Sequence, residues 1–257
     1  MEKKWKILCI GNSFSQDASR LMGQVALATG AKAVRVVNLY IGGCSVRMHW
    51  VNARKDKPAY RFEDCRGSSL LITPNFSISQ ALAADDWDWV CIQQGSSDGS
   101  FYSREESYDC LEKLVDYVRS RIKPEARIAF NLTWTGETTY QHREMAFYGF
   151  DRQRLFAEIT RVTKDVVSPL VDKVCPIGTA IHNARVDELG LMTRDGYHLS
   201  WGLGRYVAAM TLWSALTDTD ISQISWKPES VDARLQTKAV ACVKRALKAP
   251  YQVTKCQ

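Results

Sequence analysis

Short apolar runs typical of β-strands alternate along this chain with segments of helical spacing. The first run, Lys6 to Ile10, is followed by a helix pattern over residues 16–30 that ends at a glycine. The alternation continues to the last helix pattern, with strand patterns at 34–41, 87–93, 127–132 and 171–176 and helix patterns at 103–122, 151–167, 201–216 and 230–247. Such alternation is typical of a parallel sheet with helices on both faces. We therefore predict a three-layer, flavodoxin-like α/β fold with about five parallel strands.

Length and composition favour a single domain. The 257 residues are enough for one full core, and 46% hydrophobic and 24% charged residues are ordinary values for a globular protein. No internal repeat or linker interrupts the sequence. We predict one domain over residues 1–257, with a polar, irregular insertion near 50–78 and an aromatic-rich one near 136–149.

Charge and hydropathy exclude several classes of partner. The net charge of +6 is mild, and the Lys and Arg residues are scattered, so we expect no nucleic-acid partner. No apolar run approaches 18 residues, so we expect no membrane partner. The N-terminal residues show no signal peptide, which favours a cytoplasmic protein, although a secreted protein trimmed of its signal would look the same. The sequence does not indicate an oligomeric state.

The cysteines and histidines do not show metal-site spacing. None of the eight cysteines forms a C-x-x-C pair, which argues against a zinc ribbon. Cys9, Cys91 and Cys175 fall inside strand patterns, so we expect buried, reduced thiols there. The four histidines lack H-E-x-x-H or similar spacing. We predict that the protein needs no metal or cofactor.

Glycines and small polar residues follow the predicted strands. The carboxyl ends of parallel strands form the ligand site of such sheets. Far downstream, Asp195-Gly-Tyr-His198 places a carboxylate and an imidazole three residues apart. A serine hydroxyl becomes a nucleophile when a base takes its proton and a carboxylate orients that base. Ser13 after the first strand, with His198 and Asp195, supplies all three groups.

These motifs resemble the conserved blocks of the SGNH (GDSL-like) hydrolases. Gly11-Asn12-Ser13-Phe14-Ser15 is similar to their first block, in which the serine is the nucleophile. Asp195-Gly-Tyr-His198 is similar to their last block, D-x-x-H, which supplies the other two members of the triad. Gly42-Gly43 fits the second block, whose glycine amide helps to bind the oxyanion. The combination looks most like a bacterial branch of that superfamily, and the resemblance implies the catalytic triad Ser13, Asp195 and His198.

The third block departs from the family pattern. The family has G-x-N-D, in which the asparagine donates a hydrogen bond to the oxyanion, whereas this chain has Gly95-Ser96-Ser97-Asp98. We expect the oxyanion hole to consist of the Ser13 and Gly43 amides and the Gln94 side chain, with Ser97 as the alternative third donor. Neighbouring residues of a strand face opposite ways, so either Gln93 or Gln94 points to the site.

Several polar and aromatic residues are candidates for substrate binding. Aromatic faces stack on sugar rings, and the insertion near 136–149 is rich in aromatic residues. A packed insertion and hydrogen-bonded structural histidines are the alternatives. The candidates that we single out are Asn12, Ser97, Trp134, His142 and His182.

The resemblance implies a carboxylic ester hydrolase that uses a Ser-His-Asp acyl-enzyme mechanism. We expect it to remove a short acyl group, above all acetyl, from a carbohydrate or other small-molecule ester. The alternative is a non-catalytic carbohydrate-binding protein with a vestigial hydrolase site. An α/β-hydrolase is disfavoured because its serine lies in G-x-S-x-G, and a Rossmann protein because no G-x-G-x-x-G follows a strand.

Overall fold

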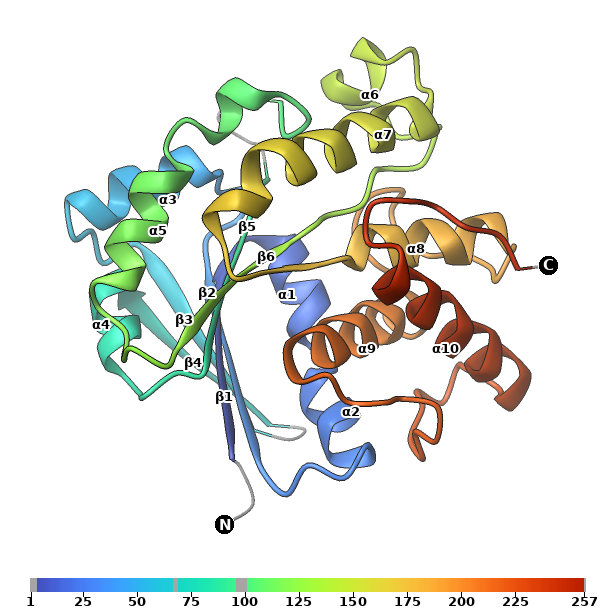
Figure 1. The fold of residues 1–257 in the computed structure, drawn as a ribbon, viewed down its shortest axis with the longest axis horizontal. Coiled ribbons are helices and arrows are strands. Elements are labelled where there is room, and N and C mark those ends of the chain that lie inside the picture. The colour runs from blue at the N-terminus through green and yellow to red at the C-terminus, as the bar shows by residue number, and fades with distance from the viewer. Residues whose placement is uncertain (1–3, 67–68, 96–100, 257) are drawn as a thin grey trace.

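A seven-stranded sheet forms the centre of the protein. The computed structural model describes residues 4–66, 69–95 and 101–256. The strand order is β4-β3-β2-β1-β5-β6-β7 (Figure 1). The five strands β2, β1, β5, β6 and β7, which are adjacent in the sheet in this order, are parallel. This confirms the predicted α/β fold with a parallel sheet. They are β1 (Trp5–Gly11), β2 (Val34–Tyr40), β5 (Trp89–Gln93), β6 (Arg127–Asn131) and β7 (Lys173–Cys175).

An antiparallel hairpin extends the sheet beyond β2. It consists of β3 (Tyr60–Arg66) and β4 (Ser69–Phe76), so our expectation of an irregular segment near 50–78 was wrong. The strand pattern was hidden because β3 buries two carboxylates, Glu63 and Asp64. Ion pairs offset the cost of burying these charges, since Arg35 lies 3.0 Å from Asp64 and Arg61 lies 2.8 Å from Glu63.

Helices cover both faces of the sheet (Figure 1). Alternate residues of β1 enter opposite cores: Ile7 and Cys9 face one, and Leu8 and Ile10 face the other. The first core is closed by α1 (Ser13–Ser19), α2 (Met22–Ala28), α8 (Ile177–Val186), α9 (Leu203–Thr217) and α10 (Ala233–Lys248). The second is closed by α3 (Val46–Arg54), α4 (Ile78–Ala83) and α5 (Leu111–Arg119).

A third, smaller core lies beyond the end of β6. It joins α6 (Arg143–Phe147) and α7 (Arg152–Val162) to Tyr102 and Leu132. The insertion near 136–149 therefore consists of turns and the short helix α6. Three short helical segments complete the described chain: η1 (Glu105–Tyr108), the π-helical η2 (Thr163–Val167) and η3 (Ser168–Leu170).

The buried thiols lie where the sequence placed them. Cys9 and Cys91 face each other on the neighbouring strands β1 and β5, Cys175 lies on β7, and all three have at most 1% of their surface exposed. Within the described ranges, no helix combines the length and the apolar composition that crossing a bilayer demands.

Candidate active site

Ser13 is the first residue of α1, and a single residue, Asn12, separates it from the end of β1. Asn12 caps the helix, because its Oδ1 accepts a hydrogen bond of 2.9 Å from the N–H of Phe14. Gly11 allows this tight passage, since a Cβ there would lie 2.5 Å from the Cβ of Ser15. The strand-to-helix turn thus holds the Ser13 hydroxyl at the carboxyl end of the sheet.

Asp195 and His198 occupy one hydrogen-bonded turn before α9. Oδ1 of Asp195 accepts hydrogen bonds from the main-chain N–H groups of Tyr197 (2.9 Å) and His198 (2.7 Å). Gly196 between them has a φ of +84°, a conformation that glycine adopts without strain. The carboxylate is therefore fixed by its own turn before it contacts the imidazole.

The three side chains form a continuous chain of contacts. Nε2 of His198 lies 3.0 Å from Oγ of Ser13, and Nδ1 lies 2.7 Å from Oδ2 of Asp195. Both distances fall in the range that we expect for a nucleophile, base and orienting carboxylate. Burial acts to raise the pKa of Asp195, but hydrogen bonds from the His198 side chain and from the N–H groups of His198 and Tyr197 outweigh burial. The pKa of Asp195 is thus held below its usual range, so the carboxylate is ionised at neutral pH.

A buried carboxylate that the sequence analysis missed ties the two motifs together. Asp17, one turn after Ser13 on α1, has no exposed surface. Its oxygens accept hydrogen bonds from Arg194 (3.0 Å), from Arg205 (2.6 Å) and from the main-chain N–H of Leu199 (2.8 Å). A buried charge persists in a fold only when it is paired. The signal in the sequence was a lone Asp on the apolar face of a predicted helix.

The turn after β2 lies against the Ser13 turn. Nδ2 of Asn12 donates to the carbonyl of Cys44 at 3.0 Å, and the N–H of Ile41 donates to the carbonyl of Gly11 at 3.2 Å. Gly43 in this turn has a φ of +60°. No described residue accepts a hydrogen bond from the main-chain N–H of Ser13. Asn12, which we expected to bind substrate, is 3% exposed. Its side chain instead forms hydrogen bonds in both turns and so holds them together.

The contacts of Gln94 do not fit its expected role as an oxyanion donor. Its Oε1 accepts from the N–H groups of Val46 (2.9 Å) and Gly95 (3.1 Å), and its Nε2 donates to the carbonyl of Ser107 at 2.7 Å. The side chain thus joins β5 to α3 and η1. It is Gln93 whose Nε2 donates to Oδ1 of Asn12, beside Ser13. Ser97, the alternative donor, lies outside the described residues.

A buried glutamate anchors the segment that follows the third block. Glu144 accepts hydrogen bonds from the N–H groups of Ser103 (2.8 Å) and Tyr102 (3.3 Å), and it has no exposed surface. Burial raises the pKa of Glu144 to about 7, although these hydrogen bonds oppose the shift. Glu144 is not among the residues singled out from the sequence.

The remaining substrate-binding candidates separate into three environments. Trp134 is 1% exposed, stacks on Phe14 and donates to the carbonyl of Tyr197 at 2.8 Å. It therefore packs against the residues next to Ser13 and His198 and is not open to a substrate. His142 caps α6 and is half-buried beside Tyr140 and Tyr197. His182 is 3% exposed and stacks on Phe156, away from the triad contacts.

Tyr140, in the insertion near 136–149, lies beside the Asp195–His198 turn. Its ring stacks on that of Tyr197 with centroids 4.7 Å apart, and its side chain lies against Gly196. Burial and the nearby Asp195 carboxylate raise the pKa of Tyr140. The ring is half-exposed, so part of it faces solvent next to the Asp195–His198 turn.

The fold and these contacts define an α/β protein with a Ser-His-Asp constellation at the carboxyl end of its parallel strands. The chain belongs to the family described as Domain of unknown function (DUF4886), whose model matches residues 6–246. None of the curated proteins matches the chain.

Two solved structures place the fold. A DUF4886 family protein from Bacteroides uniformis ATCC 8492 is 33% identical, with a TM-score of 0.92 over 98% of each chain. A GDSL-like lipase from Bacteroides thetaiotaomicron VPI-5482 is 11% identical, with a TM-score of 0.50 over 85% of this chain and 90% of that one. The second similarity extends to the fold alone, and it agrees with the SGNH-like architecture expected from the sequence.

Proposed function

We propose that this protein is a serine ester hydrolase of the SGNH type. The observation that carries the proposal is the chain of contacts from Ser13 through His198 to Asp195, at 3.0 and 2.7 Å. A vestigial site in a carbohydrate-binding protein has no need to keep this geometry, or to fix Asp195 with two main-chain hydrogen bonds. These contacts therefore favour catalysis over binding alone.

On the basis of these contacts we assign a role to each group. His198 takes the proton of the Ser13 hydroxyl through Nε2 as the oxygen attacks the ester carbonyl, and it returns that proton to the leaving alcohol. Asp195 keeps the Nδ1 proton oriented and stabilises the imidazolium. Water then attacks the acyl-enzyme, with His198 again as the base, and releases the acid and Ser13.

The oxyanion of the tetrahedral intermediate needs donors close to Ser13. We assign the main-chain N–H groups of Ser13 and Gly43, because the turns that carry them are bracketed together by Asn12. Loss of one such donor typically slows turnover by about 10²- to 10³-fold. Gln94 is left out of this assignment because its carboxamide is engaged by α3 and η1.

The substrate that fits best is a short acyl ester, above all an acetyl ester of a carbohydrate. The half-exposed ring of Tyr140 next to the Asp195–His198 turn offers a face on which a sugar ring can stack. No cofactor takes part in this chemistry. Among the described residues, no group of three His, Cys, Asp or Glu side chains is arranged to hold a metal ion.

Turnover of p-nitrophenyl esters of increasing acyl length tests the proposal. We expect hydrolysis of the acetate to exceed that of the octanoate, and Ser13→Ala to reduce acetate turnover by at least about 10³-fold. Ser225→Ala is the matched control, since Ser225 is exposed and its hydroxyl bonds to the carbonyl of Ala28. Equal turnover by Ser13→Ala and wild type would require a different nucleophile.

A further inference from the structure

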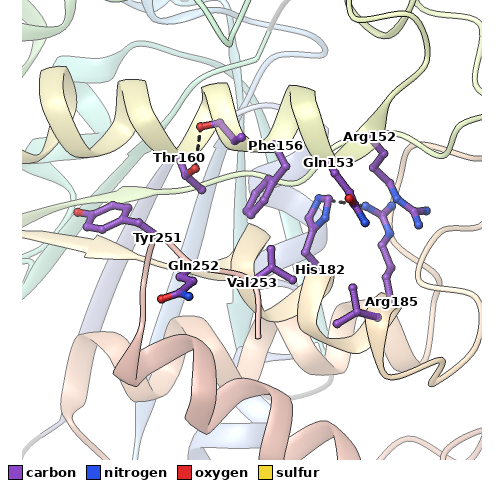
Figure 2. Close-up of a pocket in the computed structure, with 11 residues that line it drawn as sticks. Arg152, Gln153, Phe156, Thr160, His182, Arg185, Tyr251, Gln252 and Val253 are labelled. Carbon is purple, nitrogen blue, oxygen red and sulfur yellow. Dashed lines mark hydrogen bonds between the residues drawn. The ribbon is translucent and has the colours of Figure 1, made fainter. Parts of the chain in front are cut away.

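A cavity lies apart from Ser13, His198 and Asp195, between α7, α8 and the C-terminal segment 251–253. Its volume is about 420 Å³, and Ser13, Asp195 and His198 do not line it (Figure 2). Thr135 and Glu137 lie between this cavity and the Asp195–His198 turn. On one side the N–H of Glu137 donates to the carbonyl of Gly196 at 2.7 Å, and on the other the Thr135 hydroxyl lies 3.1 Å from Nε2 of His182.

One end of the cavity carries an excess of positive charge. Arg185 and Arg152 line this end (Figure 2). Both pair with a single carboxylate, Glu137, at 2.7 and 2.5 Å. The sum of these three side chains is therefore one positive charge. Arg185 is 5% exposed, and burial lowers its pKa to about 10, although Glu137 opposes the shift. An anion in the cavity would relieve this uncompensated charge.

The same end also holds hydrogen-bond donors that no described residue pairs. Nε of Arg185 is buried and has no partner among the described residues. Nη1 of Arg185 donates to Nε2 of His182 at 3.3 Å, which assigns the imidazole proton to Nδ1. No described residue accepts a hydrogen bond from that Nδ1–H. Burial, helped by Arg185 and Arg152, lowers the pKa of His182 far below its usual value, so the ring is neutral. A buried Nε without an acceptor, beside an imidazole N–H that no described residue pairs, indicates a missing partner that carries acceptors.

Apolar side chains make up most of the remaining lining, and Gln153, Thr160 and Gln252 are its polar members. Phe156 stacks on His182 with ring centroids 3.8 Å apart, and Val186, Val253 and the half-buried Tyr251 line the walls. Thr160 lines the cavity as well, but its hydroxyl already donates to the carbonyl of Ala157 at 2.8 Å. A cavity with an apolar body and polar groups at one end is the usual form of a small-molecule site.

We propose that this cavity is a binding site for a small organic monocarboxylate with an apolar or aromatic body. The carboxylate lies against Arg152 and Arg185 and accepts the Nδ1 proton of His182, while the body packs on Phe156 and Val253. The charge selects an anion, because a neutral ligand would leave both the positive charge and the extra donors uncompensated. This site is separate from the ester hydrolase proposed above and does not depend on it.

Benzoate and its neutral analogue benzamide are matched probes for this site. In isothermal titration calorimetry with the full chain, we expect saturable benzoate binding with a Kd in the range of about 0.1–1 mM, and benzamide binding at least about 10-fold weaker. Ser13→Ala protein should give the same result, which separates this cavity from the triad. No saturable benzoate binding up to about 20 mM, or equal affinities for the two probes, would overturn the proposal.

Three variants locate the binding. Arg152→Gln should weaken benzoate about 10-fold and leave benzamide unchanged, because it removes charge but keeps a polar side chain. Ala157→Phe should abolish binding of both, since the exposed Ala157 lines the cavity and a larger side chain fills it. Arg154→Gln is the control, because Arg154 is exposed on the same helix but does not line the cavity. Unchanged benzoate affinity in folded Ala157→Phe protein would place the probe elsewhere and contradict the proposal.

Discussion

Oδ2 of Asp17 accepts a hydrogen bond of 2.8 Å from the main-chain N–H of Leu199, the residue after His198. Asp17 lies one helical turn after Ser13, so this contact fixes the turn that carries His198 to the helix that carries Ser13. Arg194 and Arg205 complete the junction by pairing with the same carboxylate. The distance between Ser13 and His198 is thus set by a buried ion-pair network as well as by the triad itself.

Asp17→Asn should therefore impair both stability and catalysis. The amide keeps the shape but leaves two arginines beside Asp17 without their charge partner, and breaking such a buried pair costs about 3–5 kcal/mol in the free energy of unfolding. We expect kcat of the folded fraction to fall about 10- to 100-fold with little change in KM, because the base-bearing turn is displaced. Urea denaturation and steady-state ester hydrolysis measure the two effects.

Asp116→Asn is the control for this prediction, because Asp116 is exposed on α5. It should change neither quantity. A folded Asp17→Asn protein with wild-type kcat would show that the triad holds its geometry without the junction.

Gln94→Ala separates a structural role from an oxyanion role. The substitution leaves the N–H of Val46 and the carbonyl of Ser107 unpaired, which should cost about 1–3 kcal/mol in the free energy of unfolding for each group. Turnover of the folded fraction should fall by less than about 10-fold, well short of the loss of an oxyanion donor. A loss of 10²-fold or more, with stability unchanged, would restore Gln94 as a donor.

Glu144 should make stability depend on pH. Its pKa rises from 4.5 to about 7 on folding, so the folded state holds the proton more tightly than the unfolded state. The contribution is fully present below pH 4.5 and is lost as the pH rises through about 7. The difference amounts to roughly 3 kcal/mol at most, at 1.36 kcal/mol for each pKa unit.

Comparison of wild type with Glu144→Gln measures this effect. Urea denaturation between pH 5 and 8 should show that wild type loses free energy of unfolding relative to the variant as pH rises. Glu112→Gln, an exposed position on α5, should run parallel to wild type. A constant difference between wild type and Glu144→Gln at every pH would contradict the raised pKa.

The contacts among Ser13, His198 and Asp195 were predictable because each of these residues belongs to a short local motif. Ser13 follows a recognisable strand, and Asp195 and His198 share one turn whose spacing alone brings them together. Asp17 was not predictable in the same way. Its partners lie 177 to 188 residues away, and helical spacing shows only that its position is buried.

Two other features could not be predicted from sequence patterns. The β3–β4 hairpin was missed because the buried Glu63 and Asp64 read as polar surface until their arginine partners are known. The orientation of Gln93 and Gln94 was open because strand alternation fails at the end of β5, where both side chains are buried. In each case the outcome depends on a neighbouring strand or helix rather than on the local sequence.

The most direct test of the account is to map where a fluorophosphonate probe reacts. Wild-type protein should take up one equivalent, and mass spectrometry of the digest should place the adduct on Ser13. His198→Ala should react at least about 10²-fold more slowly, because no base remains to take the serine proton. Ser13→Ala should not react. An adduct on another residue, or undiminished labelling of Ser13→Ala, would contradict the assignment of Ser13 as the nucleophile.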